Sequence, residues 1–145
     1  MNEQTFVKRS TSSVLAGELT AAAITKAREL GKAFSIAVVD ESGVLKAFQR
    51  MDGATLVSVQ VSQDKAFSAV QSNRATHEWK ALFDDNPDLA MGAPAGIHRL
   101  IAFGGGYPLK IDGELIGGLG VSGGHPTEDM AVASAALAAV GLDGS

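Results

Sequence analysis

The chain has 145 residues, of which 46% are hydrophobic and 19% charged, a composition that fits one globular domain and excludes a disordered chain. Its formal net charge of −4, with scattered Lys and Arg, leaves no basic face for nucleic acid. The absence of cysteine excludes disulfides, thiolate nucleophiles and cysteine-based metal sites. No signal-like segment and no apolar run near ~20 residues occurs, so we expect one cytoplasmic domain over residues 1–145 with no membrane partner.

The first half of the chain predicts a helix followed by a hairpin. Apolar residues recur at helical spacing over residues 12–30, with serines before them as N-caps and Gly31 as a stop. Residues 33–39 form a continuous apolar run with β-branched members, as expected of a strand covered on both faces. Turn-forming residues 40–43 then lead into a second strand over residues 44–49.

The middle of the chain predicts a second long helix and an irregular surface segment. We expect this helix over residues 54–71, with Asp52 as its N-cap. It is apolar on two sides, so it is either partly buried or in contact with another subunit. Residues 77–83 indicate a short helical piece, and residues 84–96 are predicted to be a long loop of the kind that is often functional.

The last third is rich in predicted strands and glycine. We expect strands over residues 97–103, 107–111 and 115–122, the last two joined by an Asp-Gly hairpin turn. Alternation puts Leu115, Leu119 and Val121 on one face of the last strand and Gly118 and Gly120 on the other. Such small residues let a helix, a neighbouring subunit or a flat ligand approach closely.

The segment "GVSGGHPTEDMAV" matches one pattern typical of dinucleotide-binding proteins and one typical of hydrolases, and we reject both. Gly118, Gly120 and Gly123 spell G-x-G-x-x-G, but no second strand with a ribose-binding acid follows. The pattern G-x-S-x-G, centred on Ser122, fails because His125 lies too close along the chain to complete a triad.

A glycine-rich turn before a final helix remains. We expect this helix to start at Pro126, with His125 as its N-cap. The free N–H groups and the helix dipole would favour a carboxylate or phosphate at Gly123 and Gly124. The equally weighted alternative is that the two glycines only permit the turn and His125 only caps it.

Four segments carry a resemblance to a known family: "VVDESGVLKAFQRMDGA", "DKAFSAV", "GGGYPLKIDGELIGGLGVSGG" and "EDMAVASAAL". In this order they resemble the GlcG/HbpS-like family of haem-binding or haem-degrading proteins, and also the C-terminal part of PduO-type cobalamin adenosyltransferases. The resemblance implies an α/β fold of profilin-like α/β/α type, with a five-stranded antiparallel sheet of order 2-1-5-4-3 and helices on both faces. It further implies a homo-oligomer, a tetrapyrrole ligand, and an accessory role in a catabolic operon.

Haem requires an axial ligand and cations for its propionates. The available axial ligands are His77, His98, His125, Met51, Met91, Met130 and Tyr107, of which we select His98 and His125. His77 does not complete a His-Glu-x-x-His zinc pattern, because Ala81 stands at the second histidine position. The predicted ligand-binding residues are Arg50, Lys65, Arg99, Gly105, Gly106, Tyr107, Ser122, Gly123 and Gly124; Arg74 is a further available cation.

Two other functions stay open beside haem binding. A small enzyme for proton transfer on a carbonyl or hydroxy acid would use His98 or His125 as the base and Arg99 or Lys65 to hold a substrate carboxylate. The glycine-rich turns at 104–106 and 123–124 would then donate N–H groups to an oxyanion. A structural or regulatory oligomer without a ligand is the third function.

Overall fold

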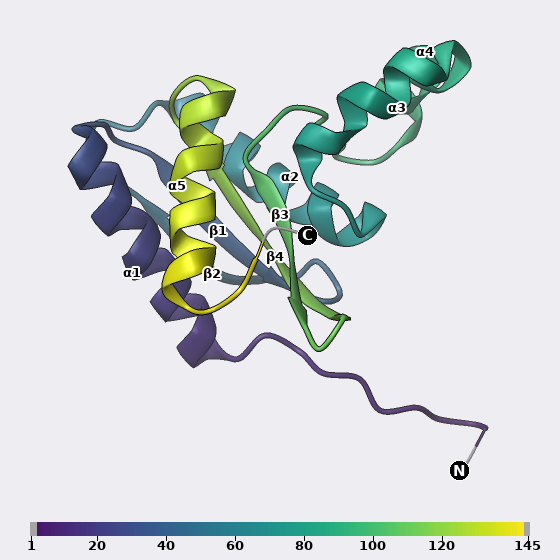
Figure 1. Ribbon diagram of the computed structural model, residues 1–145, viewed down its shortest axis with the longest axis horizontal. Helices are drawn as coiled ribbons and strands as arrows, with labels where there is room; N and C mark the ends of the chain where they lie inside the picture. Colours follow the sequence, from purple (N-terminus) through teal and green to yellow (C-terminus); the bar gives the residue numbers. More distant parts are fainter. Residues whose placement is uncertain (1–2, 144–145) are drawn as a thin grey trace.

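A computed structural model describes residues 3–143 and shows an open antiparallel sheet with helices on both faces (Figure 1). Helices α1 (Ser13–Leu30) and α5 (Pro126–Ala139) cover one face, and α2 (Leu56–Ser72) covers the other. The strands are β1 (Ser35–Asp40), β2 (Leu45–Arg50), β3 (Gly106–Ile111) and β4 (Glu114–Ser122). Their order in the sheet is β2-β1-β4-β3. The mixed α/β class is therefore confirmed.

The expected five-stranded sheet is wrong, because only four strands occur among the described residues. Residues 97–103 form a turn and an extended loop instead of a strand. Side chains of α2 hold the backbone of this loop: the Ser68 hydroxyl donates to the Arg99 carbonyl, and the Ile101 N–H donates to the Ser68 hydroxyl. Arg99 also has a positive φ of 57°. Because these backbone groups form hydrogen bonds with a side chain of α2, they do not pair with a neighbouring strand of the sheet.

The predicted caps of the first and last helices are confirmed, but that of the second is wrong. The Ser12 side chain accepts from the Leu15 N–H at the start of α1, and Gly31 ends the helix in the left-handed conformation. His125 caps α5, as predicted. Helix α2 begins after Thr55 rather than after Asp52, and its cap residue makes no side-chain hydrogen bond.

The predicted loop over residues 84–96 is also wrong. A 3₁₀ turn η1 (Thr76–Glu78) leads into α3 (Trp79–Asp85), and α4 (Pro87–Gly96) follows after one residue. Pro87 occupies the first turn of α4, where its missing N–H costs no intrahelical hydrogen bond. Glycine and proline in this segment suggested a loop, but the segment remains helical.

Helix α2 packs against the face of β4 that carries Gly118 and Gly120. A Cβ atom added at Gly120 would overlap the carbonyl oxygen of Ser62, and one added at Gly118 would overlap that of Ala66. Leu119 and Val121 face the core under α1 and α5. A register irregularity between β3 and β4 places Leu115 on the α2 side, so the predicted face shared with Leu119 is wrong.

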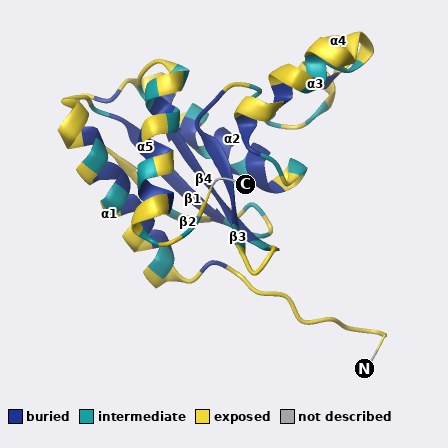
Figure 2. Cartoon of the chain, in the orientation of Figure 1, coloured by how far each residue is buried: buried dark blue, intermediate teal, exposed yellow. Residues whose placement is uncertain are grey.

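The core lies between the sheet and its covering helices, and the strands β1, β3 and β4 are largely buried, whereas the edge strand β2 is not (Figure 2). Strand β1 is buried along five of its six residues, as expected of a strand covered on both faces. The predicted Asp-Gly hairpin is confirmed, with positive φ at both Asp112 and Gly113. Among the described residues, no helix is long and apolar enough to span a bilayer.

Candidate functional site

A groove runs between α1 and the edge strand β2. It has two adjoining parts, of about 500 and 240 Å³, which share Ile24, Arg28 and Gln49 as lining residues. Small side chains of α1 and β2 line the first part: Gly17, Ala21, Thr25 and Ala47. The second part lies toward the end of β2, where it is lined by Arg50, Met51 and Asp52. These dimensions are in the range of small-molecule sites.

The spacing of residues on α1 explains why this groove exists. Gly17, Ala21, Ile24 and Arg28 are three or four positions apart and therefore share one face of the helix. The two small residues leave space above the strand. Strand β2 pairs only with β1 among the described residues, so the groove lies along an open edge of the sheet.

Two arginines without an ion pair flank the groove. Among the described residues, neither Arg28 nor Arg50 lies within 4.0 Å of a carboxylate oxygen. The Nε atom of Arg50 donates to the Ala54 carbonyl over 3.2 Å, and within residues 3–143 its terminal nitrogens form no hydrogen bond. Arg28 lies in the last turn of α1. The groove therefore offers two guanidinium groups to a dianionic ligand, with Asp52 as the only acidic lining residue.

Met51 is the one residue lining the groove that carries a soft donor atom. Its backbone is held on both sides, because its N–H donates to the Phe34 carbonyl and its carbonyl accepts from the Ala54 N–H, each over 3.0 Å. The side chain is half-buried against the core. Met51 is therefore the groove residue that could supply a sulfur ligand to a metal.

Lys65, a predicted ligand cation, lies in the protein interior. Its ammonium donates to Asp129 Oδ2 over 2.8 Å and to the Val121 carbonyl over 2.9 Å, and the Phe103 ring lies 5.2 Å away. Burial lowers the pKa of Lys65, and the hydrogen bond and charge of Asp129 act in the opposite direction. This amine is bonded within the chain, so its role in ligand binding stays a prediction that requires the pair to open.

The predicted glycine-rich turns surround this ion pair. A Cβ atom at Gly105 would lie 2.7 Å from Lys65 Nζ, so the glycine provides space for the ammonium. The Gly106 N–H donates to the Thr76 hydroxyl, and the Gly124 N–H donates to Asp129 Oδ1, each over 2.9 Å. The sequence predicts that this turn binds the carboxylate of a ligand. In the structure, the carboxylate of Asp129 takes that position. The ligand-binding role of these glycines stays a prediction.

The remaining residues of this cluster are in or near the core. Ser122 pairs with Ser35 in the sheet, and Gly123 lies against the backbone of Phe34. The Tyr107 ring is buried, with the exposed His77 ring 5.6 Å from it.

His98 and Arg99 lie together on the other face of the sheet, where they contact α2. The Arg99 guanidinium lies 4.1 Å from the Phe67 ring centroid and donates through Nε to Asp64 Oδ1 over 2.6 Å. The exposed His98 ring meets the same phenylalanine edge-on, at 5.9 Å between centroids. Arg99 also lines a hollow along α2 of about 390 Å³, called here the α2 hollow, with Leu56, Val57, Val59, Gln60, Gln63 and Asp64.

His125 is the N-cap of helix α5 and lies at the protein surface. Its Nδ1 accepts from the Thr127 N–H over 3.2 Å, and its own N–H donates to Glu128 over 2.9 Å. Glu128 pairs with Lys32, and the hydrogen bond from this ammonium lowers the pKa of Glu128. His98 and His125 therefore belong to different sites, and among the described residues no cluster of three or more His, Cys, Asp or Glu side chains forms.

Of the predicted ligand-binding residues, only Arg50 lines the α1–β2 groove. Sequence reasoning missed Arg28 and Gln49. The signal for Arg28 was its position four residues after Ile24 on the predicted helix. Gln49 carries no comparable signal, because its place opposite α1 depends on the strand pairing.

Comparison with known proteins defines the class. The profile of the family described as "Haem degrading protein HbpS-like" matches residues 12–138, and the chain belongs to this family. It is 38% identical over 126 residues to the corrinoid adenosyltransferase PduO of Salmonella typhimurium, covering 86% of this chain but only 37% of PduO. It is 33% identical to the protein GlcG of Escherichia coli, covering 77% of this chain and 80% of GlcG.

A solved structure agrees with this class. The crystal structure described as a PduOC:heme complex superposes with a TM-score of 0.84 at 35% identity, covering 93% of this chain and 98% of the other.

Proposed function

We propose that this protein binds haem or a related tetrapyrrole in the α1–β2 groove. The observation that carries the proposal is the pair of unpaired guanidinium groups, Arg28 and Arg50, beside a groove lined by both small apolar and polar side chains. A porphyrin is a flat apolar ring with two carboxylates on one edge. The two guanidinium groups would bind the carboxylates, and the small side chains leave room for the ring.

The groove residues divide into a binding surface and a charged edge. Ile24, Ala21 and Ala47 provide apolar contact for a ring face, and Gln49 adds a hydrogen-bonding side chain. Arg28 and Arg50 would pair with the carboxylates. When bound, haem would supply an iron centre, and Met51 is the groove residue whose thioether could hold the iron.

The relatives support the same class of ligand. The family description names haem degradation, one solved relative is a complex with heme, and another relative acts on a corrinoid. An accessory role in a catabolic pathway, in the cytoplasm, is the setting that we propose for the protein.

The α1–β2 groove fits a tetrapyrrole better than the α2 hollow does. In the α2 hollow the cation Arg99 already pairs with Asp64, and this carboxylate would repel a propionate. Proton transfer has less support, since neither His98 nor His125 hydrogen bonds to a carboxylate through its ring in the described chain.

Titration of the purified protein with haemin, followed by the Soret absorbance, tests the proposal. We expect saturable binding that weakens roughly tenfold to 150-fold in Arg28→Ala or Arg50→Ala, because a charge-assisted hydrogen bond contributes about 1.5–3 kcal/mol. Arg99→Ala is the matched control, since it removes an arginine from the opposite face of the sheet. Non-saturable absorbance would refute haem binding, and weakening only in the control would move the site to α2.

A further inference from the structure

Two buried hydrogen-bond donors find no acceptor in the described chain, and they belong to neighbouring side chains. They are the Nε atom of Arg74 and the indole Nε1 atom of Trp79, and no other buried side-chain nitrogen or oxygen of residues 3–143 lacks a hydrogen-bond partner. The guanidinium carbon of Arg74 lies 5.1 Å from the Trp79 ring centroid. Native proteins rarely leave a buried donor without an acceptor. The proximity of these two indicates that one acceptor group can satisfy both.

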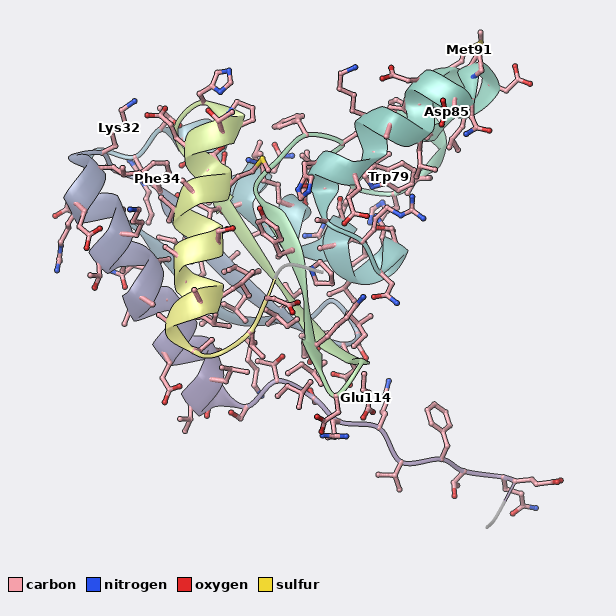
Figure 3. The ribbon with its side chains drawn as sticks, in the orientation of Figure 1. Lys32, Phe34, Trp79, Asp85, Met91 and Glu114 are labelled. Atoms are coloured by element: carbon pink, nitrogen blue, oxygen red, sulfur yellow. The ribbon has the colours of Figure 1, made fainter. Side chains whose placement is uncertain are left out.

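The pair lies where a helical hairpin joins the body of the protein. Arg74 follows α2, and Trp79 is the first residue of α3, which together with α4 projects outward (Figure 1). Figure 3 shows Trp79 at the base of this hairpin, with Asp85 and Met91 farther out. Trp79 is 6% exposed, and its ring packs against Phe83 with 5.5 Å between centroids. Arg74 is only half-buried, so solvent reaches this side chain.

The charge of Arg74 is not neutralised by another residue of the described chain. No carboxylate oxygen there lies within 4.0 Å of its guanidinium nitrogens. Glu78, four residues later, instead accepts from the Ala75 N–H over 3.3 Å. Arg74 differs in this from Arg99, whose Nε is already bonded to Asp64. An anion at Arg74 therefore meets a cation without displacing an internal carboxylate.

We propose that Arg74 and Trp79 bind the carboxylate of a small organic acid at the base of the hairpin. The Nε–H and one terminal N–H of a guanidinium form a planar fork that fits the two oxygens of a carboxylate. The indole N–H adds a third donor for one of these oxygens. Neither residue lines the α1–β2 groove, so this site goes beyond the proposed tetrapyrrole site and does not depend on it.

Nuclear magnetic resonance tests the proposal directly, because Trp79 is the only tryptophan of the chain and gives its one indole N–H signal. Isotope-labelled protein is titrated with sodium acetate and, separately, with sodium chloride at the same ionic strength. We expect acetate to move the indole signal downfield along a saturable curve, because the N–H gains an acceptor. No saturable shift, or an equal shift with chloride, would overturn the proposal.

Substitution of the arginine separates the fork from the charge. Arg74→Lys keeps a cation without a planar fork, and we expect it to weaken acetate binding about tenfold or more. Arg99→Lys is the matched control, because Arg99 also lies on an aromatic ring, that of Phe67, but is already bonded to Asp64. The control should leave the acetate curve unchanged. Equal acetate affinity in wild type and Arg74→Lys would overturn the site.

Substitution of the tryptophan tests the third donor. Trp79→Phe keeps an aromatic ring and removes the indole N–H, so the acetate titration is followed by the Arg74 Nε–H signal. We expect a saturable curve with weaker affinity than the same signal gives in wild type. An unchanged affinity would show that the indole N–H does not bind the carboxylate and would overturn its assignment. Circular dichroism confirms that each variant is folded.

Discussion

The ammonium group of Lys65 and the carboxylate of Asp129 lie 2.8 Å apart with 0% and 3% of their side chains exposed. Lys65 belongs to α2 on one face of the sheet, and Asp129 to the first turn of α5 on the other. The pair therefore joins the two helical layers across the end of β4. Gly105 leaves space for the Lys65 ammonium, and Gly106 lets β3 approach the Lys65 backbone closely.

Loss of Asp129 should be the most damaging single change of charge in this chain. Asp129→Asn leaves the Lys65 ammonium buried without a counter-charge, which typically costs ~3–5 kcal/mol. Urea unfolding measures the loss. The exposed pair Lys80–Asp84 is the control, and Asp84→Asn should cost no more than about 0.5 kcal/mol. Equal losses in the two variants would show that burial does not decide the effect.

A side chain at Gly120 should push α2 off the sheet. The added Cβ of Gly120→Ala would overlap the Ser62 carbonyl, and overpacking of this kind costs about 1–3 kcal/mol. Gly17→Ala, on α1, meets no atom within 4 Å and should stabilise its helix by roughly 0.5–1 kcal/mol. Denaturant midpoints of the two variants should move in opposite directions. A neutral Gly120→Ala would contradict the close contact.

The caps of α1 and α2 should respond differently to alanine. Ser12→Ala removes the acceptor for the Leu15 N–H and should cost about 1 kcal/mol. Thr55→Ala removes no capping hydrogen bond, so we expect a change of only a few tenths of a kcal/mol. Thermal unfolding of both variants gives the comparison, and a larger loss for Thr55→Ala would refute it.

Acid should weaken the link between Lys32 and Glu128. The hydrogen bond from Lys32 lowers the pKa of Glu128 below its ordinary 4.5, and the His125 N–H acts in the same direction. A lowered carboxyl pKa stabilises the fold above pH 4.5, and the contribution disappears as the pH falls through the folded value.

The stability difference between wild type and Glu128→Gln should therefore shrink below pH 4.5. Glu18→Gln, an exposed carboxylate on α1, is the control. Urea unfolding at several pH values measures both variants, and a difference independent of pH would contradict the expectation.

The spectrum of the haem-loaded protein should identify the axial ligand. In the α1–β2 groove we expect Met51 to ligate iron, so Met51→Leu should shift the Soret band while binding remains saturable. His98→Ala and His125→Ala should leave the band unchanged, because neither residue lines the groove. A shift in either histidine variant would instead support the ligands that the sequence predicts and would move the site.

Local patterns gave reliable predictions where neighbouring residues alone decide the structure. The Ser12 and His125 caps and the hairpin at Asp112 depend on contacts within four residues. Residues 97–103 were mispredicted for the opposite reason. Ser68, which lies some thirty residues earlier, binds this backbone segment, and no local pattern reveals that contact.

The sequence by itself determined the family, the mixed α/β class and most element boundaries, because periodicity and turn chemistry are local. Only the tertiary structure decided the site. Pairing of β2 at the sheet edge brought Arg50 and Met51 alongside Arg28, and packing of α2 on β4 enclosed Lys65 with Asp129. A groove or a buried ion pair is formed by segments far apart in the chain. Packing therefore decides whether the charge of a lysine or arginine faces a ligand or a partner inside the protein.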